Sequence, residues 1–332
     1  EVARRQGVLV AEWLRVGYVQ GNMNSDNTLL GGRTLDYGPF GFVDSFMPTW
    51  TPFTSDYERK FGFLRQPSAA ALNIQVLAES IAGLVHAELR TYGVDEEALG
   101  YGDEKETAEM MIKYAMNVFT GTFRNRYTSN SRKKLGLPGD LSESQLKEVD
   151  TLWNELLELL AATNCDYTLF FWKLADAAAC VREERERPLA PGVDAGATVE
   201  KMAAALAGCS YSDLGPGEAN QLDRWSDWLL QYKTMLLSTS GEAGANNEAS
   251  DKSRGLSRQI QVMRTVSPRY VLRSFMAQQV IEYAEAGNSE PLLRLHQLLS
   301  TPYEEQPLVE SSTGGVDSQL ADIYQSWQGL TP

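Results

Sequence analysis

Apolar residues recur every three or four positions along most of this 332-residue chain, which is the spacing of one buried face of an α-helix. The first such stripe, which stops before Gly17, comprises Leu9, Val10, Trp13, Leu14 and Val16. Further helical stripes follow Pro67, a residue typical of the first helical turn, and Ser142, which is spaced for a capping box with Gln145. The pattern therefore predicts a mainly α fold.

The second half of the chain contains one break in this pattern. Residues 238–255 include no large apolar side chain, a composition typical of a flexible insertion. Beyond it, Ser267 and Pro268 predict the N-cap and first turn of a helix that continues through Val280. We expect residues 256–332 to be helices that pack on the same domain as residues 1–237.

A small β-hairpin is predicted around Gly31-Gly32, because both positions of a two-residue hairpin loop tolerate positive φ. Counting outward from this loop places Asn27 opposite Asp36, with Cβ atoms about 4.5–5.5 Å apart. One carboxamide and one carboxylate oxygen at this separation suit a hard divalent cation such as Mg²⁺. Asp26 lies on the other side of the extended backbone, where it can act as a base.

The same residues have a second interpretation. Asn and Asp beside glycine are ordinary turn formers, and their side chains often bond only their own backbone. The polar run Asn22 to Asn27 is, however, flanked by an apolar helix and by Leu29 and Leu30, so it is anchored at both ends. An anchored loop can position ligands, and the local pattern alone leaves both interpretations open.

Composition narrows the class of protein. The chain is 43% hydrophobic and carries 44 acidic against 30 basic residues, so it can bury a large core and has a formal charge of −14. That charge repels nucleic acid and anionic membranes. No apolar run approaching the ~20 residues of a membrane span, and no signal-type stretch, is evident. We therefore expect no nucleic-acid or membrane partner and an intracellular site, cytoplasmic or mitochondrial.

The chain contains few cysteine and histidine side chains that could act in catalysis or bind a metal. Cys165, Cys180 and Cys209 are too few for a disulfide framework, and we expect reduced, mostly buried thiols. His86 and His296 are the two histidines, and each lies within a helical pattern. A histidine zinc site or a Ser-His-Asp triad is therefore disfavoured.

Six short motifs follow one another in the order of a known family. They are Asn24-Ser25-Asp26-Asn27, Leu35-Asp36-Tyr37-Gly38-Pro39-Phe40-Gly41-Phe42, Phe63-Leu64-Arg65-Gln66-Pro67, Asp166-Tyr167-Thr168 with Phe170-Phe171, Ser267-Pro268-Arg269-Tyr270-Val271-Leu272-Arg273 and Pro302-Tyr303-Glu304-Glu305-Gln306-Pro307. Together they closely resemble selenoprotein O, a protein-kinase-like group. The resemblance implies a protein-kinase-like C-terminal lobe with family-specific C-terminal helices.

The resemblance also implies an activity. Proteins of this group bind ATP in a reversed orientation and transfer AMP to Ser, Thr or Tyr hydroxyls of proteins, with Mg²⁺. Carried over by position, Asp26 corresponds to the proton acceptor, and Asn27 and Asp36 correspond to the Mg²⁺ ligands. Asp36 also lies against the nucleotide in this comparison.

Three departures from the family accompany the resemblance. Gln20 stands where the family commonly has His, and the chain ends at Pro332 without the family's C-terminal Cys or selenocysteine, so redox control is not assigned. The resemblance begins at the catalytic loop, so we expect the nucleotide-binding lobe to be absent from this chain and the chain by itself to be inactive. Two other functions remain open: a kinase-like phosphotransferase and a non-catalytic binding or scaffold module.

Overall fold

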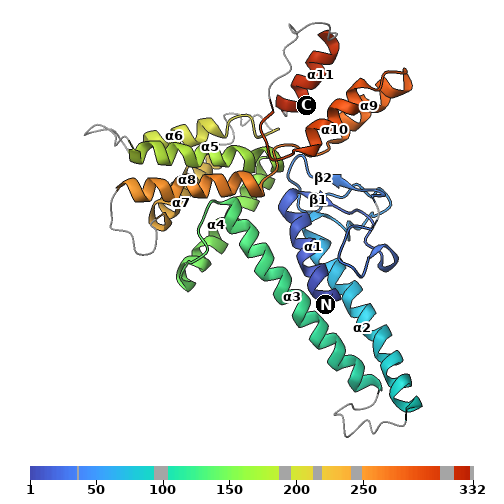
Figure 1. Cartoon of the computed structure of the whole chain (residues 1–332). Helices are drawn as coiled ribbons and strands as arrows, with labels where there is room; N and C mark the ends of the chain where they lie inside the picture. Colours follow the sequence, from blue (N-terminus) through green and yellow to red (C-terminus); the bar gives the residue numbers. More distant parts are fainter. Residues whose placement is uncertain are drawn as a thin grey trace. The chain divides into compact units, whose positions relative to one another are not determined.

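The computed structural model describes residues 1–35, 37–92, 104–186, 196–211, 219–240, 249–306 and 318–329. The chain divides into two compact units, which are described separately below (Figure 1). The first unit comprises Glu1–Phe40 and Pro48–Asn130, and the second comprises Gly41–Met47 and Ser131–Pro332.

The first unit is built on three helices. They are α1 Val2–Val16, α2 Gln66–Thr91 and the part of α3 Glu104–Lys134 that precedes Ser131; the unit also contains β1 Tyr18–Val19 and the 3₁₀ turns η1 Ser25–Asn27 and η2 Phe63–Arg65. Val10 of α1, Ile74 of α2 and Phe119 of α3 belong to one buried apolar cluster. Burial of these facing stripes stabilises the unit, since each fully buried side chain of this type contributes about 1.5–3 kcal/mol.

The second unit is arranged around α5 Tyr167–Glu186, which lies beside α6 Gly196–Ala205 and α8 Ala249–Val266 (Figure 1). Helix α5 is apolar on most of its circumference, as expected of a helix inside a core. The unit also contains β2 Gly41–Phe42, α4 Glu143–Ala162, α7 Ala219–Thr239, α9 Ser274–Glu285, α10 Glu290–Ser300 and α11 Ser318–Gly329.

The mainly α fold with a small β element is confirmed. Pro67 lies in the first turn of α2 as predicted, one residue after the helix begins, and the capping box at the start of α4 is present. In that box, the Ser142 amide donates to Gln145 Oε1 at 2.9 Å and the Gln145 amide donates to Ser142 Oγ at 3.3 Å. The prediction of free cysteines is also confirmed, and Cys165 and Cys209 are buried.

The strands predicted on either side of Gly31-Gly32 are wrong, because the strands of the described chain are β1 and β2. The turn is shifted by one residue, since the Gly32 amide donates to the Leu29 carbonyl at 2.9 Å and Gly32 itself has a φ of 69°. Helix α1 holds this segment instead of a partner strand. Gln6 Nε2 donates to the Leu29 carbonyl at 2.7 Å, and Trp13 Nε1 donates to Thr34 Oγ1 at 3.1 Å.

The helix predicted from Ser267 begins seven residues later, at Ser274. The backbone amides of Arg269 and Tyr270 donate to the Pro302 carbonyl at 2.7 and 3.2 Å, which is incompatible with a helical turn there. Of the predicted insertion, residues 249–255 belong to α8, and residues 241–248 lie outside the described residues.

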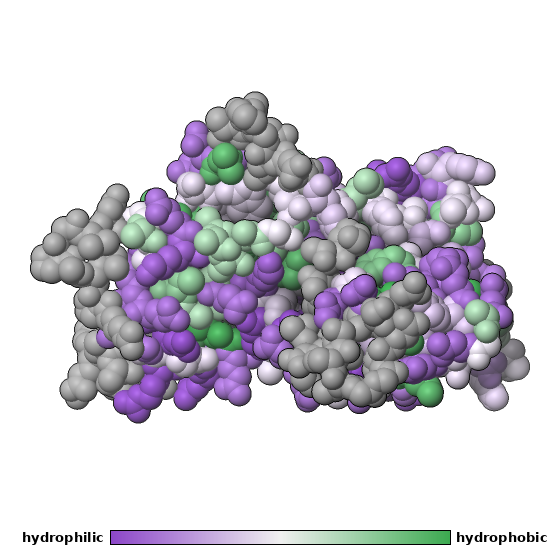
Figure 2. Space-filling model, turned by 90° about the horizontal axis from the view of Figure 1, so that it is seen from above, coloured by the Kyte–Doolittle hydropathy of each residue, from purple (hydrophilic) through white to green (hydrophobic). Residues whose placement is uncertain are grey.

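The visible surface is largely hydrophilic (Figure 2). In Figure 2, hydrophilic residues cover much of the visible face, and hydrophobic residues lie among them in small patches. One described helical stretch, Phe63–Glu88, is nevertheless long and apolar enough to cross a membrane. Its most apolar 18 residues have a mean hydropathy of 1.4, and 22% of them are buried. One such helix is weak evidence for a membrane span, since core helices can have the same length and composition. The expectation of no membrane partner is therefore not confirmed.

Candidate functional site

The candidate catalytic loop is a tight turn rather than a strand. The Asn27 amide donates to the Asn24 carbonyl at 2.9 Å, and the Thr28 amide donates to the Ser25 carbonyl at 3.2 Å. These bonds form η1, in which Asp26 is exposed and Asn27 is half-buried. The turn places a carboxylate and a carboxamide side by side at the surface of the first unit.

A side chain from α2 holds both ends of this loop. Asn73 Nδ2 donates to the Met23 carbonyl at 2.8 Å and to Thr28 Oγ1 at 3.0 Å. The two acceptors lie on opposite sides of Asp26 and Asn27 in the sequence. One carboxamide on a packed helix therefore fixes the loop, and sequence reasoning did not identify it.

A second carboxamide fixes the chain just before the loop. Gln66, which is fully buried, accepts from the Gln20 amide at 3.0 Å and donates to the Tyr18 carbonyl at 2.9 Å. The Gln20 side chain, which stands where the family commonly has His, accepts from the Tyr18 hydroxyl at 2.6 Å. The departure at Gln20 is thus accommodated by a buried hydrogen bond.

Gly21 brings the start of the loop against the segment that follows Asp36. Its φ is 77°, and a Cβ atom there would lie 1.9 Å from the Pro39 carbonyl oxygen. The rings of Tyr18 and Phe40 stack with centroids 5.9 Å apart, and the Tyr37 ring lies edge-on to Tyr18 at 6.2 Å. The start of the loop is therefore adjacent to residues 37–40, although the strands of the described residues, β1 and β2, include neither segment.

The metal assignment itself is not tested by these contacts, because Asp36 lies outside the described residues. Within the described ranges, no group of three or more His, Cys, Asp or Glu side chains could hold a metal ion. The donor set of Asn27 and Asp36 consists of oxygen atoms, which suits Mg²⁺. Their joint coordination of one ion stays a prediction.

A second polar cluster, in the second unit, was also missed. Arg273, whose side chain is 1% exposed, donates to both carboxylate oxygens of Asp166 at 2.6 and 3.0 Å. It also donates to Asp44 at 2.5 Å, and the Tyr211 hydroxyl donates to Asp166 at 2.6 Å. Burial lowers the pKa of Arg273, but the two carboxylates outweigh it and raise that pKa above its ordinary value.

This cluster serves to hold irregular chain segments in place. Burial raises the pKa of Asp44, and the Arg273 guanidinium opposes that rise. The neighbouring Tyr167 amide donates to the Asp44 carbonyl at 3.0 Å, which fixes the segment beside α5. The motif that begins at Asp166 and the motif that begins at Ser267 thus meet through Asp166 and Arg273. These two motifs were the signal in the sequence from which the cluster could have been found.

The described helices of the first unit and the loop that carries Asp26 and Asn27 lie within a part of the chain that matches a known protein family. Residues 1–300 match the family described as "Protein adenylyltransferase SelO", and the chain belongs to this family.

Three curated relatives carry the name "Protein nucleotidyltransferase YdiU". The protein of Aeromonas hydrophila is 33% identical over 93% of this chain and 51% of its own length. That of Alkalilimnicola ehrlichii is 32% identical over 99% and 54%, and that of Nitrosospira multiformis is 31% identical over 92% and 49%. The chain therefore spans about half the length of these relatives.

Proposed function

We propose that this chain carries the catalytic loop of a Mg²⁺-dependent protein adenylyltransferase that transfers AMP from ATP to protein hydroxyls. The observation that carries the proposal is the Asp26-Asn27 turn, which Asn73 holds at both ends, in a loop whose start at Gly21 lies against the Pro39 carbonyl. Family membership supports the same reaction, since the family and the relatives are named for adenylyl or nucleotidyl transfer to protein.

In this proposal the three side chains have separate roles. Asp26 accepts the proton from a Ser, Thr or Tyr hydroxyl as its oxygen bonds to the α-phosphorus and the bond to pyrophosphate breaks. Asn27 and Asp36 would hold Mg²⁺, and Asp36 would also lie against the nucleotide. When bound, the ion supplies neutralisation of charge on the phosphate oxygens. The fixed turn limits the reorganisation that these groups undergo during the reaction.

Isotope transfer tests the proposal in the protein as its gene encodes it. ATP labelled at the α-phosphate should transfer label to protein, and ATP labelled at the γ-phosphate should transfer none. Transfer of the γ label alone would replace adenylylation by phosphoryl transfer. Absence of any Mg·ATP binding in calorimetry would instead favour a binding or scaffold module.

A further inference from the structure

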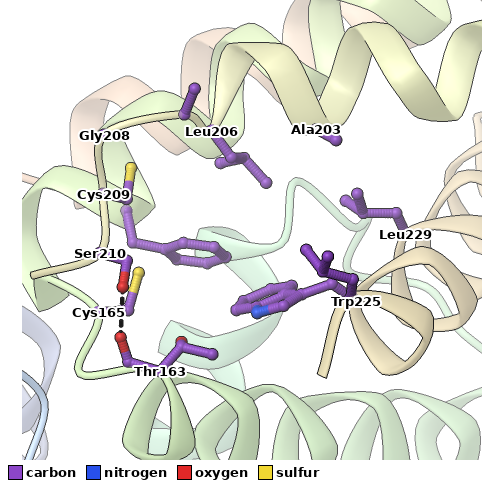
Figure 3. Close-up of a pocket in the computed structure, with 12 residues that line it drawn as sticks. Thr163, Cys165, Ala203, Leu206, Gly208, Cys209, Ser210, Trp225 and Leu229 are labelled. Carbon is purple, nitrogen blue, oxygen red and sulfur yellow. Dashed lines mark hydrogen bonds between the residues drawn. The ribbon is translucent and has the colours of Figure 1, made fainter. Parts of the chain in front are cut away.

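The second unit contains a pocket of about 360 Å³ that the proposed reaction does not use (Figure 3). Its walls come from the start of α5, from α6 and the segment after it, and from α7. Figure 3 shows Cys165, Cys209, Ser210 and Thr163 gathered at one end, with Trp225 across from them. The volume lies within the range of small-molecule sites, which is about 300–1,000 Å³.

One side of the pocket is aromatic and aliphatic. The rings of Phe170 and Trp225 have centroids 5.7 Å apart and are tilted by 40°. Leu206 lies above them and Leu229 beside them, while Leu222 at the rim is 49% exposed. Flat rings stack favourably on such surfaces.

The thiol end is uncharged. Hydrogen bonding with Cys209 raises the pKa of the Cys165 thiol, and burial raises it further. Neutral thiols behave as small apolar groups and are poor nucleophiles and metal ligands. The Ser210 hydroxyl is already committed to the Thr163 carbonyl. This end therefore offers apolar contact rather than a charged or reactive group.

The remaining walls disfavour an ionic ligand. The described residues that line the pocket include no charged side chain. Lys173, which lies near Gly208 at the rim, donates Nζ to the Ala207 carbonyl at 2.6 Å. A carboxylate or phosphate would lose its hydration here without gaining an ionic partner. We infer that the pocket binds a small, uncharged aromatic molecule of one or two fused rings.

Alkylation of the three cysteines tests this inference in the chain described here. Indole is the probe, iodoacetamide is the reagent, and mass spectrometry gives a rate for each cysteine. Indole at about ten times its dissociation constant should slow alkylation of Cys165 and Cys209 about tenfold. Cys180 does not line the pocket and is the internal control, so its rate should not change. Indole-2-carboxylate should leave all three rates unchanged.

A pair of variants separates pocket binding from general stabilisation. Ala203→Trp fills the pocket and should abolish protection by indole, whereas Ala204→Trp, at a neighbouring exposed position, should preserve it. Unchanged rates at Cys165 and Cys209 would overturn the inference. So would equal protection of Cys180, or protection that persists in Ala203→Trp. Rates that depend on protein concentration and not on indole would assign the surface to a second copy of the chain.

Discussion

Replacing Asn73 with alanine tests whether α2 holds the catalytic loop. The substitution removes both hydrogen bonds from Nδ2, to the Met23 carbonyl and to Thr28 Oγ1. A protein hydrogen bond contributes about 0.5–1.5 kcal/mol net, so the two together give about 1–3 kcal/mol. Since about 1.4 kcal/mol corresponds to a factor of ten, the population of the ordered loop relative to open forms should fall about 5- to 150-fold.

Hydrogen exchange on the chain measures this loss directly. The Asn27 and Thr28 amides, which close the turn, should exchange faster in Asn73→Ala by the same factor. In the protein as its gene encodes it, the kcat of AMP transfer should fall by a similar factor, because the loop carries the proposed base Asp26. The matched control is Gln75→Ala, which removes a carboxamide that donates to Glu79 on the exposed face of α2.

The control also defines the refutation. Gln75→Ala should leave both amide exchange at the turn and AMP transfer within about twofold of the wild type. If Asn73→Ala behaves like Gln75→Ala in both measurements, the loop is ordered by other contacts. A change in exchange without a change in transfer would separate loop order from catalysis and contradict the role given to the turn.

Four other substitutions have defined outcomes. Asp26→Ala should abolish AMP transfer while nucleotide affinity is retained, whereas Asp36→Ala should raise the Kd of Mg·ATP in calorimetry. Gly21→Ala should lower the urea midpoint of unfolding. A positive φ alone costs a residue with a Cβ about 1–3 kcal/mol, and the Pro39 carbonyl oxygen occupies the place of that Cβ. The control is Gly31→Ala, whose added Cβ would have no contact closer than 3.9 Å and should leave the midpoint unchanged. Arg273→Met should destabilise the second unit by about 3–5 kcal/mol, because it leaves the buried Asp166 carboxylate without its ionic partner.

Each of these has a contrary result. Transfer by Asp26→Ala at the wild-type rate would remove the base from the mechanism. A Gly21→Ala midpoint equal to that of Gly31→Ala would mean that the chain can move away from Pro39. For Arg273→Met the control is Arg224→Ala, which removes an exposed ion pair with Glu158. Equal unfolding curves for these two arginine variants would show that the buried cluster contributes no stability.

Much of the helical framework follows from local pattern. The capping box at Ser142 and the proline at the start of α2 predict helix ends because they satisfy backbone groups within a few residues. Helix α8 was missed at its start because residues 249–255 are polar or small. Further along α8, Leu256 and Met263 are fully buried, so tertiary packing supplies stability that propensity does not.

The site shows the same division between local and long-range information. Asp26 and Asn27 could be singled out from their neighbours, but the turn register could not, because contacts from α1 replace the expected ladder. Asn73 lies 50 residues from Met23, and Gln66 lies 46 from Gln20. A polar residue on a long helix reads as solvent-facing until the fold brings a loop against it.

Paramagnetic broadening can show whether Asn27 and Asp36 bind one ion together. Mn²⁺ would replace Mg²⁺ in the gene's complete protein with ATP bound, and amide signals would be compared with the Mg²⁺ sample. The signals of Asn27 and Tyr37 should broaden together and should recover in Asp36→Ala. Broadening that spares these residues, or that persists unchanged in Asp36→Ala, would contradict the proposed metal site.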